Sequence, residues 1–115
     1  MQYLLMLNTA ESYFAGLSQA EVGKTMAAYG AYTQALKDAG VFRGGERLQA
    51  TATATVVRAK NGKTSVLNGP YAEVKEQLGG FYLIDAPDLD AAIGWAARCP
   101  AAEHGAVEVR PIWSM

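Results

Sequence analysis

The sequence predicts a single α+β domain over residues 1–115, a ferredoxin-like split βαβ unit with an antiparallel sheet and an added β-hairpin. Short apolar runs suited to strands occur near the start of the chain, at residues 81–84 and near its end. Two longer segments carry apolar residues at helical spacing, and a β-branched stretch with a turn signal lies between them. A content of 50% hydrophobic and 18% charged residues is typical of one compact domain.

The first third of the chain supplies a strand and the best-marked helix. Residues 2–7 form a short, almost continuous apolar run, which predicts a strand buried on both faces. Ser18 and Glu21 have the spacing of a capping box, and Gly40 is a C-terminal stop signal. We therefore expect a helix over residues 18–39.

The middle of the chain predicts a β-hairpin. Residues 51–57 alternate with β-branched side chains, which is typical of a strand. Asn61 and Gly62 form a two-residue turn signal in front of a second short strand at residues 64–67. Two antiparallel strands are expected to meet there.

A polar segment follows the hairpin. The turn formers Asn68-Gly69-Pro70-Tyr71 interrupt the strand pattern, and residues 72–77 are predicted to form a short charged helix. We interpret Gly79-Gly80 as a helix stop or a β-bulge, because the lysine and hydroxyl residues of a phosphate-binding loop are missing.

The last third predicts a strand, a helix and a strand. Residues 81–84 form the second apolar strand, and Pro87-Asp88 opens a helix with an apolar stripe. Residues 107–112 form the final strand. Cys99 falls at the end of this helix, where we expect a small buried residue rather than a nucleophile.

The two apolar strands also predict a homodimer. Helices cover only one face of such a sheet, so the strands should alternate if the other face met water, yet residues 4–7 and 81–84 do not. A large apolar second face is a liability on a monomer, and the commonest remedy is a twofold partner. We expect the chain to associate with itself through the sheet face.

Composition argues against several function classes. Ten Lys and Arg against eleven Asp and Glu give a net charge of -1, without a basic run for nucleic acid to follow. No apolar stretch is long enough to span a membrane, and the apolar start lacks the flanks of a signal peptide, so we expect a cytoplasmic protein. A single cysteine and a single histidine do not make a structural zinc site, and we expect neither metal nor cofactor.

Four segments carry a family resemblance: Ala39-Gly40-Val41, Gly44-Gly45-Glu46-Arg47-Leu48, the block from Asn68 to Ile84, and Val107-Glu108-Val109-Arg110-Pro111. They resemble the YCII-related family, in its branch named for an Asp-Gly-Pro-Phe motif. The resemblance extends over nearly the whole chain and implies the dimeric α/β-barrel superfamily. It implies no settled activity.

The sequence departs from that family at three positions. Asn68 and Tyr71 stand where the motif has Asp and Phe. Tyr29 stands at the helix position where many relatives carry a histidine, which in the wider family belongs to a pocket with a suggested His and Asp pair. The one histidine, His104, is expected in an exposed loop, which makes it a poor general base.

Glu73, Lys75 and Glu76 are the candidate catalytic residues. They place two carboxylates and an amine within about one helical turn. Such a cluster could orient a polar substrate, or one carboxylate could act as a base if burial raised its pKa. The alternative is a solvated helix end whose charges pair with each other or with Arg47 and Arg110.

Tyr29, Tyr71 and Arg110 are the candidate ligand-binding residues. Arg110 lies on the opposite face of its strand from Val107 and Val109, where it could hold a carboxylate or pair with Glu73 or Glu76. Most aromatic residues at helical or strand spacing are expected to pack in the core or the dimer, with Tyr29 as the exception. The aromatic residues considered are Tyr29, Tyr32, Tyr82, Trp95 and Trp113.

Two functions are compatible with these features. The first is a homodimer that binds or converts a small polar molecule in a pocket between sheet and helices, using cofactor-independent acid-base chemistry of a lyase, isomerase or hydrolase-like kind. The second is a non-catalytic interaction or regulatory module built on the same dimer.

Overall fold

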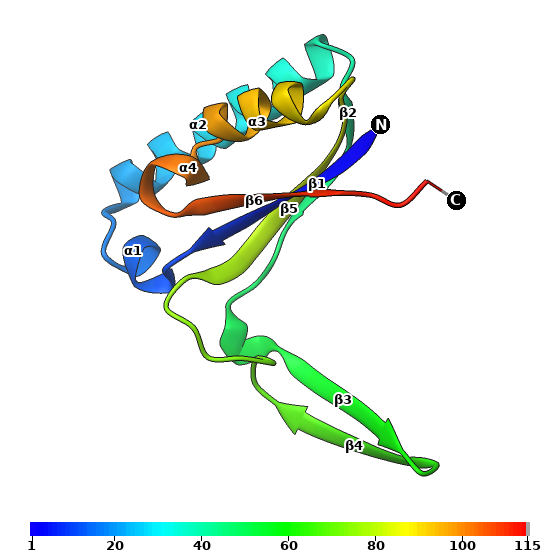
Figure 1. Cartoon of the computed structure of the whole chain (residues 1–115). Helices are drawn as coiled ribbons and strands as arrows, with labels where there is room; N and C mark the ends of the chain where they lie inside the picture. The colour runs from blue at the N-terminus through cyan, green and yellow to red at the C-terminus, as the bar shows by residue number, and fades with distance from the viewer. Residues whose placement is uncertain (115) are drawn as a thin grey trace.

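We describe the fold from a computed structural model, which covers residues 1–114 (Figure 1). The strands are β1 (Gln2–Thr9), β2 (Phe42–Arg47), β3 (Thr55–Lys60), β4 (Lys63–Asn68), β5 (Gln77–Asp85) and β6 (Ala106–Pro111). The helices are α1 (Glu11–Ala15), α2 (Gln19–Asp38), α3 (Leu89–Arg98) and α4 (Ala101–His104), with a 3-10 turn at Thr51–Thr53. The predicted α+β class with antiparallel sheets is confirmed.

The strands form two separate sheets. The main sheet has the order β2-β5-β1-β6 with antiparallel pairs, and β3 pairs only with β4. The helices lie on one side of the main sheet, while the β3–β4 hairpin stands away from it on the other side (Figure 1). We call residues 48–76, which contain this hairpin, the arm, and the remaining described residues the body.

Helix α2 begins and ends where the sequence predicts. The Ser18 hydroxyl accepts a hydrogen bond from the Glu21 N–H at 3.2 Å, and the Glu21 carboxylate accepts one from the Ser18 N–H at 3.1 Å. This capping box satisfies two N–H groups at the helix start. At the other end, Gly40 has a φ of +74°, a backbone conformation that glycine adopts without strain.

The core lies between the main sheet and its helices. In β1 the side chains of Tyr3, Leu5 and Leu7 are buried, and they alternate with Leu4 and Met6, which remain partly exposed in the single chain. The prediction of a strand buried on both faces is therefore not met within one chain. Cys99 caps the end of α3 and is buried, as predicted, and burial raises the pKa of its thiol.

The predicted hairpin is confirmed with a shorter first strand. Asn61 and Gly62 both have positive φ, as a two-residue hairpin turn requires. The predicted start of the first strand is wrong, because the Thr53 hydroxyl donates to the Ala50 carbonyl at 2.6 Å and closes a 3-10 turn there. Threonine competes in this way with the sheet for backbone partners.

The predicted helix over residues 72–77 is wrong. Residues 69–76 form an irregular loop, and the side chains of residues 71–76 are exposed. A helix this short has no buried face to stabilise it, and nucleation is costly. The neighbouring Gly79 is the extra residue of a β-bulge, since Leu7 pairs with Gly80 while Asn8 pairs with Leu78.

Strand β2 is absent from the predicted elements because glycine weakens a strand pattern. Here the glycine is required: a Cβ on Gly45 would lie 2.8 Å from the ring of Tyr82 on β5. No helix within residues 1–114 is long and apolar enough to cross a membrane.

Candidate functional site

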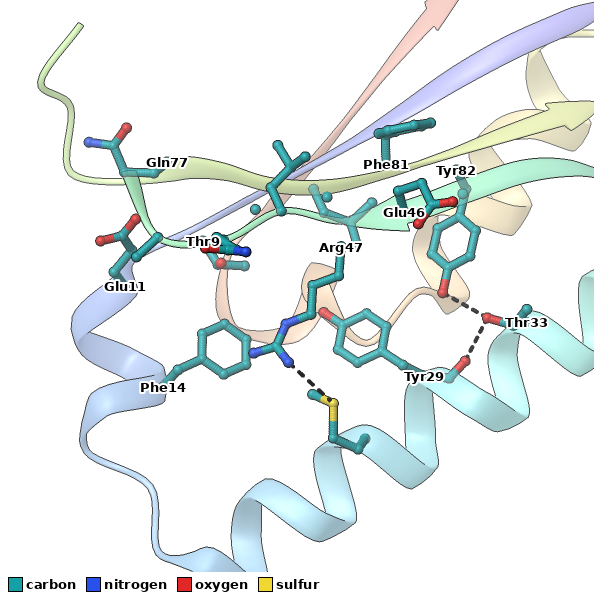
Figure 2. A pocket seen from close by; sticks show the side chains of 18 of the residues that line it. Thr9, Glu11, Phe14, Tyr29, Thr33, Glu46, Arg47, Gln77, Phe81 and Tyr82 are labelled. Carbon is teal, nitrogen blue, oxygen red and sulfur yellow. Dashed lines mark hydrogen bonds between the residues drawn. The ribbon is translucent and has the colours of Figure 1, made fainter. Parts of the chain in front are cut away.

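A cavity of about 460 Å³ lies on the helix side of the sheet (Figure 2). It is bounded by α1, α2, β2, β5 and the end of β1, together with the first residues of the arm. Its size fits a small organic molecule. The side chains that define its chemistry are Thr9, Glu11, Phe14, Met26, Tyr29, Thr33, Phe42, Arg47, Gln77 and Tyr82.

A chain of hydrogen bonds fixes the aromatic wall of the cavity. The Thr33 hydroxyl donates to the Tyr29 carbonyl at 2.9 Å and lies 2.8 Å from the Tyr82 hydroxyl. Because the single hydroxyl proton of Thr33 is used on the carbonyl, Tyr82 must donate to Thr33. The Tyr82 hydroxyl proton is therefore used within the protein and is not available to a ligand.

The Tyr29 hydroxyl is free to serve a ligand. Figure 2 shows its ring between α2 and the sheet, beside the Arg47 side chain. Within residues 1–114 this hydroxyl makes no hydrogen bond. Burial raises the pKa of Tyr29 to about 12, so the phenol stays neutral at physiological pH and acts as a hydrogen-bond donor.

Arg47 brings a positive charge into this apolar surrounding. It pairs with the buried Gly80 in the β2–β5 register, and its guanidinium reaches the space between Phe14 and Tyr29 (Figure 2). Its one hydrogen bond is a weak contact of 3.8 Å with the sulfur of Met26. No carboxylate among residues 1–114 forms an ion pair with it, and a guanidinium in that position attracts an anion.

Two acidic residues, Glu11 and Glu46, line the cavity, and Glu46 belongs to the opposite face of strand β2 from Arg47. Glu11 is already engaged. Its carboxylate accepts a hydrogen bond of 2.7 Å from the Thr51 N–H at the start of the arm. The contact ties α1 to the arm. Glu11 therefore shapes the rim of the cavity rather than neutralising Arg47.

Of the six residues singled out from the sequence, Tyr29 is the one that lines the cavity. Glu73, Lys75 and Glu76 lie in the exposed loop of the arm. Tyr71 is 78% exposed and its ring contacts the guanidinium of Arg58 at 5.4 Å. A catalytic or binding role for these four residues stays a prediction.

Arg110 lies on the opposite side of the sheet from the cavity. It pairs with Leu4 in the β1–β6 register and forms an ion pair of 2.5 Å with Glu108. The expected ion pair of Arg110 with Glu73 or Glu76 is wrong. A ligand-binding role for Arg110 stays a prediction, but it would concern the sheet face that no helix covers.

His104 does not lie in an exposed loop, so that expectation is wrong. It ends the short helix α4, and its ring stacks on Tyr13 at a centroid distance of 4.1 Å. Its Nε2 atom is buried and makes no hydrogen bond among the described residues. The sequence pattern missed helix α1, which carries Tyr13 and Phe14 and covers this ring.

Most of the remaining aromatic residues pack in the core, as expected. The Tyr32 hydroxyl donates to the Trp95 carbonyl at 2.7 Å, and the rings of Tyr32 and Tyr82 meet edge to face. Trp113 is exposed in the single chain. Arg47 and Phe14 were not singled out as site residues, although Arg47 stands in the Gly44-Gly45-Glu46-Arg47 segment and shares a strand face with Gly45.

Comparisons with known proteins agree with this architecture. A model of the family described as the YCII-related domain matches residues 1–115. The chain belongs to the YCII-related family. Uncharacterized protein R00369 of Rhizobium meliloti (strain 1021) is 37% identical over 114 residues, which cover 97% of this chain and 92% of that protein.

A solved structure shares the fold of this YCII-related protein. It is the 5-chloro-2-hydroxyhydroquinone dehydrochlorinase TftG from Burkholderia phenoliruptrix AC1100, in complex with 2,5-dihydroxybenzoquinone. The two chains are 18% identical, the TM-score is 0.56, and the match covers 99% of this chain and 94% of TftG. At that identity the likeness shows the shared fold alone.

Proposed function

We propose that this YCII-related protein binds, and converts, a small planar molecule with an acidic group in the cavity between the sheet and α2. The observation that carries the proposal is the guanidinium of Arg47, which enters an aromatic cavity without a carboxylate partner among the described residues. A carboxylate on the ligand supplies that partner with two parallel hydrogen bonds, and a phenolate supplies it through its single oxygen.

The rest of the cavity suits a ring. Phe14, Tyr29 and Tyr82 provide faces or edges for an aromatic or quinoid ligand. The Tyr29 hydroxyl donates a hydrogen bond to an oxygen on that ring. TftG has a small hydroxylated quinone bound on the same fold, which supports this ligand class as a proposal.

Conversion of the ligand requires proton transfer in or near the cavity. Arg47 stabilises negative charge that develops on a ligand oxygen, which favours loss of a proton from an adjacent carbon or hydroxyl. Glu76 directly precedes Gln77, a residue that lines the cavity, and it is the member of the Glu73, Lys75 and Glu76 cluster nearest in sequence to that rim. Glu76 is our candidate for the general base.

We also propose that the protein works as a homodimer that joins the uncovered faces of two sheets. On this face Leu4 lies opposite Leu83 and Met6 lies opposite Phe81 in neighbouring strands. These cross-strand pairs form a continuous apolar strip that a twofold partner would bury. The turn Asn68-Gly69-Pro70-Tyr71 supports placement in the Asp-Gly-Pro-Phe branch.

Isothermal titration calorimetry with a small panel tests the binding proposal. Benzoate, 4-hydroxybenzoate and 2,5-dihydroxybenzoquinone are the probes, and neutral benzamide is the matched control for benzoate. We expect the two carboxylates to bind and benzamide to bind at least about tenfold more weakly, because it lacks the charge that Arg47 attracts. Equal binding of benzoate and benzamide, or no binding by any probe, would favour a non-catalytic interaction module.

A further inference from the structure

We propose that the β3–β4 hairpin is a clasp that docks onto a second copy of this chain, seated against the uncovered face of the main sheet. The inference rests on the homodimer proposed above and names the structural element that holds the two copies together. The occupant is a second copy rather than a different protein, because the surface that the chain leaves exposed matches what a homodimer buries.

The single chain exposes too much surface for a monomer of its mass. Its accessible surface is 7818 Å², whereas a folded monomer of 12.2 kDa exposes about 6,100 Å². Its radius of gyration is 16.1 Å, against about 13 Å for a compact domain of this length. If two copies each buried the excess, the interface would total about 3,400 Å², within the range of obligate homodimers.

The position of the hairpin fits that role. Figure 1 shows it projecting on the side of the main sheet that no helix covers, which is the side a second copy would occupy. Strands β3 and β4 belong to no larger sheet in their own chain. A two-stranded hairpin is marginally stable alone in water, so it gains stability by packing on another surface.

The side chains of the hairpin are those of a contact surface. Val57 and Val66 face each other across the strands and are 60% and 59% exposed, and Leu67 is 61% exposed. Val57 and Val66 share one face of the hairpin, whereas Leu67 follows Val66 and belongs to the other face. Burial of the valine face against the second copy removes its apolar area from water, at roughly 25 cal/mol for each Å².

The basic charge of the hairpin has one counterpart on the uncovered face that no described ion pair neutralises, the carboxylate of Glu46. Arg58, Lys60 and Lys63 make both strands basic, and neither strand carries an acidic residue. Glu46 pairs with Phe81 in the register and so belongs to the uncovered face, as does Glu108, which already bonds Arg110. In a twofold dimer each hairpin would meet this face of the other copy.

Sedimentation equilibrium of designed variants tests the clasp. The test variant is the double substitution Val57→Thr and Val66→Thr, which keeps β-propensity while removing apolar contact from the face that these two residues share. The matched control is the double substitution Thr64→Ser and Ser65→Thr in the same hairpin. We expect the test variant to weaken dimerisation at least about tenfold and the control to change it less than about twofold.

Two further measurements keep the outcomes distinct. A variant in which a short Gly-Ser linker replaces residues 55–68 should show the same loss, with near-ultraviolet circular dichroism reporting an intact body. A wild-type chain that is monomeric at micromolar concentration would contradict the homodimer itself. If the wild-type chain is a dimer and both hairpin variants dimerise with the same affinity, the clasp is overturned and the homodimer stands. The ligand titrations test the cavity and do not depend on either result.

Discussion

The body and the arm contain the same kinds of apolar residue but differ in how far the single chain buries them. In the body, Leu5 and Leu36 are fully buried by their own chain. In the arm, Val57, Val66 and Leu67 are each about 60% exposed. The helix side of the body is therefore buried within one chain, whereas we propose that the apolar residues of the arm are buried by a second copy. The following predictions sharpen that contrast, from the largest expected effect to the smallest.

Truncation in the body core should have the largest effect. Leu36→Ala removes a fully buried side chain from α2, and we expect the free energy of unfolding to fall by about 3 kcal/mol, from lost burial and the cavity left behind. Urea denaturation at a fixed protein concentration measures it. A loss below about 1 kcal/mol would mean that α2 packs loosely on the sheet.

Loss of the cavity guanidinium should weaken ligand binding about tenfold. Arg47→Gln keeps length and polarity but removes the charge, so binding of 4-hydroxybenzoate should fall by that factor while benzamide binding stays unchanged. Arg43→Gln is the matched control on the same strand, since Arg43 hydrogen-bonds Asp85 and does not line the cavity. Equal losses in the two variants would remove Arg47 from the proposed site.

Removal of the helix cap should cost about 1 kcal/mol of stability. Ser18→Ala leaves the Glu21 N–H without its side-chain acceptor at the start of α2. Ser18→Asp restores an acceptor and should recover most of the loss, and thermal unfolding of the three proteins at one concentration gives the comparison. If Ser18→Asp is no more stable than Ser18→Ala, the side-chain cap does not stabilise this helix.

Alkaline pH should destabilise the body through Tyr29. Burial raises the folded-state pKa of Tyr29 to about 12 from an ordinary value of 10.0, so the neutral phenol favours the folded state. This contribution is fully present below pH 10 and is lost as the pH rises toward 12. Because Tyr29 is only partly buried, we expect less than about 1 kcal/mol, measured as a smaller stability loss between pH 10 and 12 in Tyr29→Phe. An identical loss in that variant would contradict this assignment.

The smallest effect should come from the arm. In the background of Leu83→Asp, which is designed to prevent dimerisation, Val66→Ala should change the free energy of unfolding by less than about 0.5 kcal/mol, because Val66 is exposed in the single chain. The same substitution in the wild-type background should weaken the dimer. A large loss in the monomeric background would show that the arm packs on its own body.

The sequence predicted the parts of the fold that local chemistry specifies. Ser18 with Glu21, Gly40 and the Asn61-Gly62 turn act through neighbouring backbone, and each forms as expected. Strand β2 was missed because two glycines weaken its pattern, and the reason for one of them, Gly45, is a distant contact with the ring of Tyr82. The helix predicted over residues 72–77 does not form, because a helix this short needs a buried face and these side chains are exposed.

The candidate site was harder to predict than the fold. Tyr29 was placed in a pocket from its position in the helix, and it lines the cavity. Arg47 lines the same cavity only because β2 pairs with β5, a contact between residues at least 33 positions apart in sequence, as for Arg47 and Gly80. Glu73, Lys75 and Glu76 formed a dense charged pattern in the sequence, but local charge density does not determine where a loop lies.

Chemical-shift mapping tests most directly whether the body, and not the arm, holds the ligand. Uniformly ¹⁵N-labelled protein is titrated with 4-hydroxybenzoate and followed in ¹H–¹⁵N correlation spectra. We expect saturable shifts of the amides of Thr33, Arg47 and Gly80 around the cavity, with the hairpin amides of β3 and β4 unchanged. Shifts confined to the loop that carries Glu73, Lys75 and Glu76, with the cavity amides unchanged, would contradict the proposed site.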